Sequence, residues 1–182
     1  KFKLSMKKFF LGFWILTNTI AFTAGPDLQT DKIPDCGEKQ IEFKDYPASG
    51  TFDGKSRMLN LDSVKKKDLR NFLGLKPRKI KSPNFAKFFR IIKGGCGTMC
   101  TTYVAIDCRD GEPYPLGIAA TLGIRYRKDS SLIIMESEED LKKLNNELKE
   151  QYLVDKTTYF YWKDNKLTPI CTRKFTQGGL SK

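Results

Sequence analysis

Two cysteines stand close together in a glycine-rich stretch, where thiol chemistry and backbone freedom coincide. Cys96 and Cys100 lie within Gly94–Cys100, together with three glycines and Met99. Because Gly97 lets this short loop bend, a local disulfide is sterically feasible and would staple the loop. The same two sulfurs could instead form a reducible redox pair. With Met99 they also make a set of three soft ligands, which suits Cu(I).

The remaining cysteines leave the disulfide connectivity open. The chain has five cysteines, so one stays unpaired if two bridges form. Cys108 and Cys171 each end a predicted strand and make a reasonable second pair. Cys36 would then be free, or it would compete with Cys108 for Cys171. The C-x-x-x-C spacing resembles that of thioredoxin-like copper-delivery proteins, but their histidine and the βαβ context are missing here.

The lack of histidine removes several common chemistries. Ser-His and Cys-His nucleophilic pairs, imidazole bases and imidazole metal ligands are excluded together. Zinc would lack a full set of well-spaced ligands, and no phosphate-binding or dinucleotide-binding motif occurs. A carboxylate-based glycan hydrolase using Asp129 remains a third hypothesis. The acids concerned stand beside predicted turns, and turn formation explains them better: Asp107, Asp110, Glu112 and Asp129.

The charge distribution indicates an exported, basic protein. The chain has a formal charge of +12, and residues 1–24 have the basic start, apolar middle and small-residue end of a signal peptide. Removal of its four lysines would leave 29 basic and 21 acidic residues, or +8. We expect no transmembrane segment after cleavage. Arg125, Arg127 and Lys128 could line an exposed sheet face that binds an acidic polymer or protein, while nucleic acid is disfavoured because no RNA-binding motif is present.

These candidate residues are positioned by a chain of predicted strands with two helices. After an irregular arm over 25–40, a single domain is expected over 41–173, followed by a flexible tail over 174–182. Amphipathic spacing predicts helices over 62–74 and, after the capping serine Ser137, through Leu141, Leu144, Leu148 and Tyr152. The expected strands are Ile41–Phe43, Phe85–Lys93, Thr101–Asp107, a segment around Tyr114, Leu116–Tyr126, Ser131–Met135, Thr157–Trp162 and Lys166–Thr172. Short turns between strands require antiparallel pairing. The predicted fold is therefore α+β, a mostly antiparallel sheet or meander with two short helices packed on it.

Six short motifs follow one another along the chain in a recognisable order. They are Ser82-Pro83-Asn84-Phe85-Ala86, Gly95-Cys96-Gly97-Thr98-Met99-Cys100, Ala105-Ile106-Asp107, Asp110-Gly111, Tyr126-Arg127-Lys128-Asp129-Ser130-Ser131-Leu132 and Thr158-Tyr159-Phe160-Tyr161-Trp162. On these residues, the chain between Phe43 and Ile170 resembles a family of uncharacterised secreted bacterial proteins. It departs from that pattern at Lys87-Phe88-Phe89 and at Lys93-Gly94. The resemblance implies an envelope or secreted protein and brings no activity with it.

The sequence thus favours an exported domain, periplasmic or secreted, that binds rather than catalyses. Its expected partner is a protein or an anionic envelope component, bound through the loops around Cys96–Cys100 and the basic sheet face, and no cofactor is expected. The alternative hypothesis is a thiol redox or Cu(I)-handling protein that uses Cys96 and Cys100.

Overall fold

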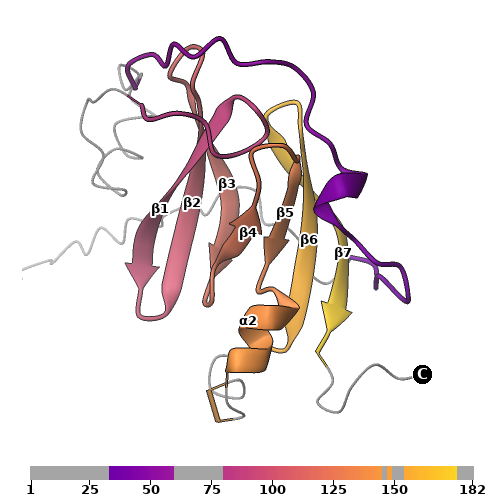
Figure 1. Ribbon diagram of the computed structural model, residues 1–182. Helices are drawn as coiled ribbons and strands as arrows, with labels where there is room; N and C mark the ends of the chain where they lie inside the picture. Colours follow the sequence, from indigo (N-terminus) through magenta and orange to yellow (C-terminus); the bar gives the residue numbers. More distant parts are fainter. Residues whose placement is uncertain (1–32, 60–79, 145–146, 149–153, 176–182) are drawn as a thin grey trace, which may run out of the picture.

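The computed structural model describes residues 33–59, 80–144, 147–148 and 154–175, in which the strands form two antiparallel sheets (Figure 1). The first sheet has the order β1-β2-β3 and the second the order β4-β5-β6-β7. Within each sheet every strand pairs with its neighbour in the sequence, so both sheets are meanders. The strands are β1 Phe89–Gly97, β2 Cys100–Asp107, β3 Pro113–Ala120, β4 Ile124–Tyr126, β5 Leu132–Met135, β6 Lys156–Lys163 and β7 Lys166–Lys174.

The two sheets share one hydrophobic core, in which aromatic side chains meet. Phe89 of β1 and Trp162 of β6 have ring centroids 5.2 Å apart, and Phe85 lies 6.0 Å from the same Trp162 ring. These contacts are edge-to-face, a geometry that the aromatic quadrupole favours. Smaller apolar side chains from both sheets complete the core: Ile91, Ala105, Leu116, Ile118, Ala120 and Ile133. Burial of this apolar surface is the main force that holds the sheets together.

Parts of the outer faces of the sheets are also covered. Leu59 and Ile80 pack over Val104, Ile106 and Cys108 on the first sheet. On the second sheet, the segment that begins at residue 33 covers the outer face, where Cys36, Ile41, Leu132, Tyr159 and Cys171 form a third buried cluster. Neighbouring residues on β5, Leu132 and Ile133, are therefore buried in different clusters on opposite faces. This explains why β5 is a continuous apolar run rather than an alternating one.

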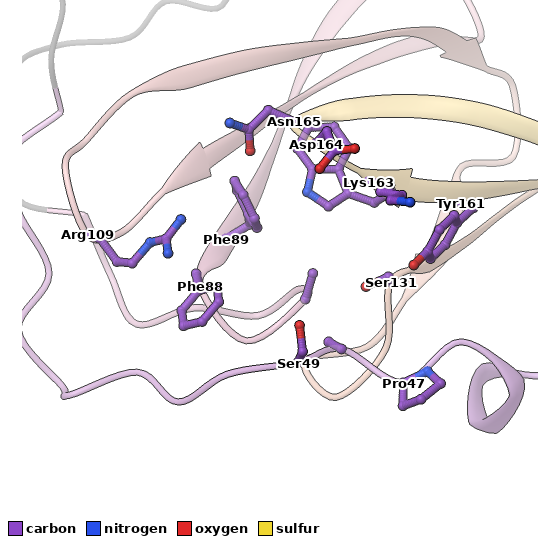
Figure 2. A pocket seen from close by; sticks show the side chains of 13 residues that line it. Pro47, Ser49, Phe88, Phe89, Arg109, Ser131, Tyr161, Lys163, Asp164 and Asn165 are labelled. Atoms are coloured by element: carbon purple, nitrogen blue, oxygen red, sulfur yellow. The ribbon is translucent and has the colours of Figure 1, made fainter.

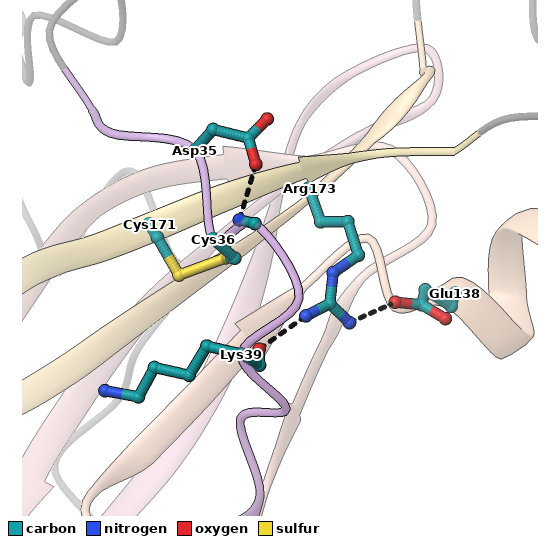
Figure 3. The surroundings of a disulfide bond; sticks show 7 residues. Asp35, Cys36, Lys39, Glu138, Cys171 and Arg173 are labelled. Atoms are coloured by element: carbon teal, nitrogen blue, oxygen red, sulfur yellow. Dashed lines mark hydrogen bonds and ion pairs between the residues drawn. A yellow bond between two sulfur atoms is a disulfide. The ribbon is translucent and has the colours of Figure 1, made fainter. Parts of the chain in front are cut away.

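Strand β7 anchors the N-terminal arm to the second sheet. Cys36 donates its N–H to the Thr172 carbonyl, and Thr172 donates to the Pro34 carbonyl, each at 2.8 Å. The Cys36–Cys171 disulfide joins the same segments, with its Cα atoms 5.0 Å apart. Figure 3 shows Arg173 beside this bridge, where it donates to the Lys39 carbonyl and pairs with Glu138 at 3.0 Å. One arginine therefore links β7, the arm and the start of helix α2, which covers Glu138–Lys143.

The structure confirms the antiparallel strand organisation and corrects some elements. Helix α2 covers Glu138–Lys143 behind the predicted Ser137 cap, but it ends at Leu144, whose backbone is extended. The predicted strand Ile41–Phe43 is wrong. Phe43–Asp45 forms the 3-10 helix η2, stabilised because the Asp45 carboxylate accepts the Glu42 N–H at 3.1 Å. The predicted helix over 62–74, and Tyr152, lie outside the described residues.

Two predicted strands also have different bounds. The Phe85–Lys93 run begins its strand only at Phe89, because Ala86 and Lys87 adopt positive φ angles of 40° and 64° and form a turn. The Leu116–Tyr126 run is divided into β3 and β4, with Gly123 at φ 115° between them. Within the ranges that the structure covers, no helix is long and apolar enough to cross a membrane.

Candidate ligand groove

An open groove of about 450 Å³ lies where the N-terminal segment meets the rims of both sheets (Figure 2). Phe89 and Trp162 of the core form part of its lining. The other lining residues are Pro47–Ser49, Ala86, Phe88, Arg109, Ser131, Tyr161 and Lys163–Asn165. Hydroxyl, amide and charged groups therefore surround an aromatic lining.

Arg109 is the most firmly held charged group of the groove. Its Nε donates to both oxygens of Asp107, at 3.0 and 3.1 Å, and its Nη2 donates to Oδ2 at 2.6 Å. Asp107 also accepts the Arg109 backbone N–H, and only 2% of its surface is exposed. These hydrogen bonds raise the pKa of the Arg109 guanidinium above its ordinary value. Arg109 therefore keeps its charge and has a fixed orientation.

The aromatic ring of Phe88 packs against the Arg109 guanidinium. The Arg109 Cζ atom lies 4.2 Å from the centroid of the Phe88 ring, a cation–π contact. The ring is confined on another side by Gly50, at which an added Cβ would lie 2.3 Å from the Phe88 Cζ atom. A side chain at position 50 would therefore displace Phe88. The Nη1 atom of Arg109 makes no hydrogen bond within the described part of the chain, so the guanidinium retains donors for a ligand.

Two turns fix the remaining walls. Asp164 and Asn165 have φ angles of 50° and 57° and join β6 to β7 as a two-residue hairpin turn, which presents Lys163 beside the groove (Figure 2). The turn at Ala86 and Lys87 is held because their N–H groups donate to the carbonyls of Arg127 and Lys128, at 3.3 and 2.7 Å. These hydrogen bonds stabilise a backbone conformation that is unfavourable for residues other than glycine.

The predicted basic face is largely neutralised by local acids. Arg125 pairs with Glu139 and Asp140 of α2, and these hydrogen bonds raise the pKa of its guanidinium. Arg127 pairs with Asp129 at 2.8 Å. Lys128 is exposed and makes no ion pair among the described residues. None of the three basic residues lines the groove.

The cysteines adopt one of the connectivities that the sequence left open. Cys96 and Cys100 are bridged at the tip of the β1–β2 hairpin, with Cα atoms 5.1 Å apart. Cys171 pairs with Cys36, so its pairing with Cys108 is wrong. Cys108 is unpaired and fully buried, and burial raises the pKa of its thiol to about 11. Cys171 pairs with Cys36 because the backbone hydrogen bonds of Thr172 with Pro34 and Cys36 hold the arm beside β7.

At the hairpin tip, Cys96 is exposed and Cys100 is half-buried. Met99 is 39% exposed and has φ 54°. Because both cysteine sulfurs are in a disulfide, the predicted Cys96, Met99 and Cys100 copper set offers no thiolate in this oxidised state. Within the described residues there is no group of three His, Cys, Asp or Glu side chains that could hold a metal ion.

The candidate acids form turns rather than a catalytic pair. Asp110 accepts the Glu112 N–H at 2.8 Å, and Asp107 is occupied by Arg109. The hydrogen bond from Arg127 holds the pKa of the Asp129 carboxyl below its ordinary value. Asp129 therefore remains ionised at neutral pH and is poorly suited to donate a proton to a leaving group.

Other motif residues have clear structural roles. The Asn84 amide bonds to β1 and to the Tyr126 hydroxyl, at 3.3 Å for the latter. Ser130 is buried, and its hydroxyl bonds to the carbonyls of Phe43 and Tyr46 at 2.8 and 2.9 Å. Arg109 and Phe88 line the groove but carry no clear signal in the sequence, and Gly50 acts only through its contact with Phe88. The only local signal was the Asp107-x-Arg109 spacing next to a turn.

Comparison with protein-family models, with curated proteins and with solved structures finds no match.

Proposed function

We propose that this protein is an exported, non-catalytic domain that binds an anionic envelope polymer in the groove around Arg109. The observation that carries the proposal is the arrangement of that arginine. Asp107 and Phe88 fix the guanidinium, while 54% of the Arg109 side chain remains exposed. An arginine held in this way loses little conformational entropy when it binds a carboxylate or phosphate.

The rest of the groove suits a polar, extended ligand. Lys163 is exposed beside it and makes no ion pair among the described residues, so it adds a second positive charge, while Asp164 next to it adds a negative one. Ser49, Asn165 and Tyr161 supply hydroxyl and amide groups for neutral parts of a polymer.

Three further features support export and binding. The predicted signal peptide and the charge of +8 that remains without it favour a basic exported protein. Disulfides persist mainly in oxidising compartments, and two of the five cysteines form the buried Cys36–Cys171 bridge.

Matched arginine variants test the proposal. Arg127 is 56% exposed and pairs with an acid two residues away, as Arg109 does, but Asp129 is 55% exposed whereas Asp107 is buried, and Arg127 lies outside the groove. We expect Arg109→Gln to weaken binding of polygalacturonate or polyphosphate by about 10- to 100-fold, the value of a charge-assisted hydrogen bond. Arg127→Gln should leave the affinity within about twofold, and raised salt should weaken binding of the unmodified protein. Equal losses in both variants would favour the sequence-predicted basic face instead.

A thiol redox or Cu(I)-handling function is the second candidate, favoured by the exposure of Cys96. In the redox reaction, a substrate dithiol would give two electrons and two protons to the Cys96–Cys100 disulfide and itself become a disulfide. This requires that Cys96–Cys100 be reduced by millimolar glutathione while the buried Cys36–Cys171 bridge stays intact. Resistance of both bridges, and no Cu(I) uptake after chemical reduction of the tip, would remove this candidate.

A further inference from the structure

The outer edge of β1 is covered along only part of its length. In an antiparallel edge strand, alternate residues direct their backbone N–H and C=O groups away from the sheet. Phe89 does so, because its N–H donates to the Phe85 carbonyl at 2.9 Å and its carbonyl accepts the Phe85 N–H at 3.0 Å. The same alternation places Ile91, Lys93 and Gly95 on the outer edge.

The side chain of Asn84 covers the edge at Ile91. Its Oδ1 accepts the Ile91 N–H at 2.8 Å, and its Nδ2 donates to the Ile91 carbonyl at 3.4 Å. The amide group thus takes the place of a neighbouring peptide unit. The Asn84 side chain does not reach the next outward-facing residue, Lys93.

The edge at Lys93 and Gly95 is open. Among the described residues, neither backbone has a hydrogen-bond partner on the outer side. Both residues are exposed, and a Cβ added at Gly95 would meet no atom within 4 Å. Immediately beyond, a register shift between Gly95 and Gly97 and the Cys96–Cys100 disulfide end the strand at a closed hairpin tip. Another extended chain could therefore approach this part of β1 directly.

We propose that the Lys93–Gly95 edge of β1 binds an extended acidic peptide as an additional strand. The exposed N–H and C=O groups are complementary to another extended backbone. The charged residues of β1 are Arg90 and Lys93, both basic, and Arg90 is already bonded to the Ser82 carbonyl at 2.7 Å. Lys93 has no ion pair among the described residues, so an acidic side chain opposite it stabilises the added strand. A second copy of this chain is disfavoured, because β1 has no acidic residue that could lie opposite Lys93.

The test uses the full chain and synthetic peptides. The probe is a blocked hexapeptide of alternating glutamate and valine, and the comparison peptide has lysine in place of glutamate. In Gly95→Pro the outward N–H is lost while the bonds to β2 are retained, whereas Gly95→Ala keeps the N–H and serves as the matched control. We expect Gly95→Pro to weaken binding of the acidic peptide about fivefold or more, Lys93→Gln to weaken it, and Gly95→Ala to leave it unchanged.

Hydrogen exchange of the unmodified protein gives a readout that does not depend on a variant. The acidic peptide should slow exchange of the Lys93 and Gly95 amides, and Arg109→Gln should not change this result. The proposal is overturned if the basic peptide binds equally well, if Pro and Ala at position 95 behave alike, or if Arg109→Gln abolishes peptide binding, which would place the peptide in the groove. Sedimentation of the chain as a dimer that Gly95→Pro dissociates would show that a second copy occupies the edge.

Discussion

The two disulfides are expected to contribute very different amounts to stability. Cys36–Cys171 spans 135 residues of sequence and Cys96–Cys100 only four. In the chain-entropy account, a bridge stabilises the fold by restricting the unfolded chain, and the effect grows with the logarithm of the loop. The longer loop gives about 5 kcal/mol at 25 °C and the shorter one about 2 kcal/mol. Burial of Cys36 and Cys171 in a hydrophobic cluster should add to the difference.

Urea unfolding of two double variants measures this difference. We expect Cys36→Ala/Cys171→Ala to lose about 3 kcal/mol more than Cys96→Ala/Cys100→Ala, and the second variant to keep a cooperative transition close to that of the unmodified protein. Replacement of both partners avoids a new thiol that could exchange with Cys108. Equal losses, or a larger loss on removal of the hairpin-tip bridge, would refute the assignment of Cys36–Cys171 as the bridge that holds the arm on β7.

Three other outcomes follow from buried polar groups. Because burial raises the pKa of Cys108 to about 11, its thiol should resist iodoacetamide at pH 8 in the folded protein and react after unfolding, as mass spectrometry can show. Burial also raises the pKa of the Glu136 carboxyl above 4.5, so the folded state holds that proton more tightly than the unfolded state. The contribution of Glu136 to the free energy of unfolding is therefore present below about pH 4.5 and is lost as the pH rises through its pKa in the folded state. Urea unfolding at a series of pH values should show this loss in the unmodified protein and not in Glu136→Gln. Asn84→Ala should destabilise the protein by about 1–3 kcal/mol because Ile91 loses its edge partner, whereas Tyr126→Phe, which removes only one bond to Asn84, should cost about 1 kcal/mol in the same assay.

Local sequence patterns predicted much of the fold because the corresponding structures depend on nearby residues. The Ser137 cap requires only its own hydroxyl and the Asp140 N–H. The hairpin at Asp164 and Asn165 requires residues that tolerate positive φ. By contrast, the Phe85–Phe88 turn has the apolar pattern of a strand. Its conformation depends on bonds to carbonyls about 40 residues further along the chain, which no local pattern reveals.

The candidate site was harder to predict for the same physical reason. Arg125 has the residue type of an anion-binding group, but Glu139 and Asp140 neutralise it from a different element. Arg109 gave a weaker signal in the sequence. It too is paired with an acid, Asp107, but unlike Arg125 it lines the groove, and its guanidinium lies over the Phe88 ring. Residue type and spacing identify possible ligands for an anion. Only the tertiary contacts show which of them are already occupied.

The most direct test of the anion-binding account is an NMR titration that follows the arginine side-chain Nε–H signals while hexagalacturonate is added at low salt. We predict that the Arg109 signal shifts with saturation, that the Arg125 and Arg127 signals stay in place, and that phosphate oligomers compete if the groove recognises negative charge alone. Shifts confined to Arg125 and Arg127, with Arg109 unchanged, would contradict the central claim. They would show that the polymer binds at Arg125 and Arg127 instead.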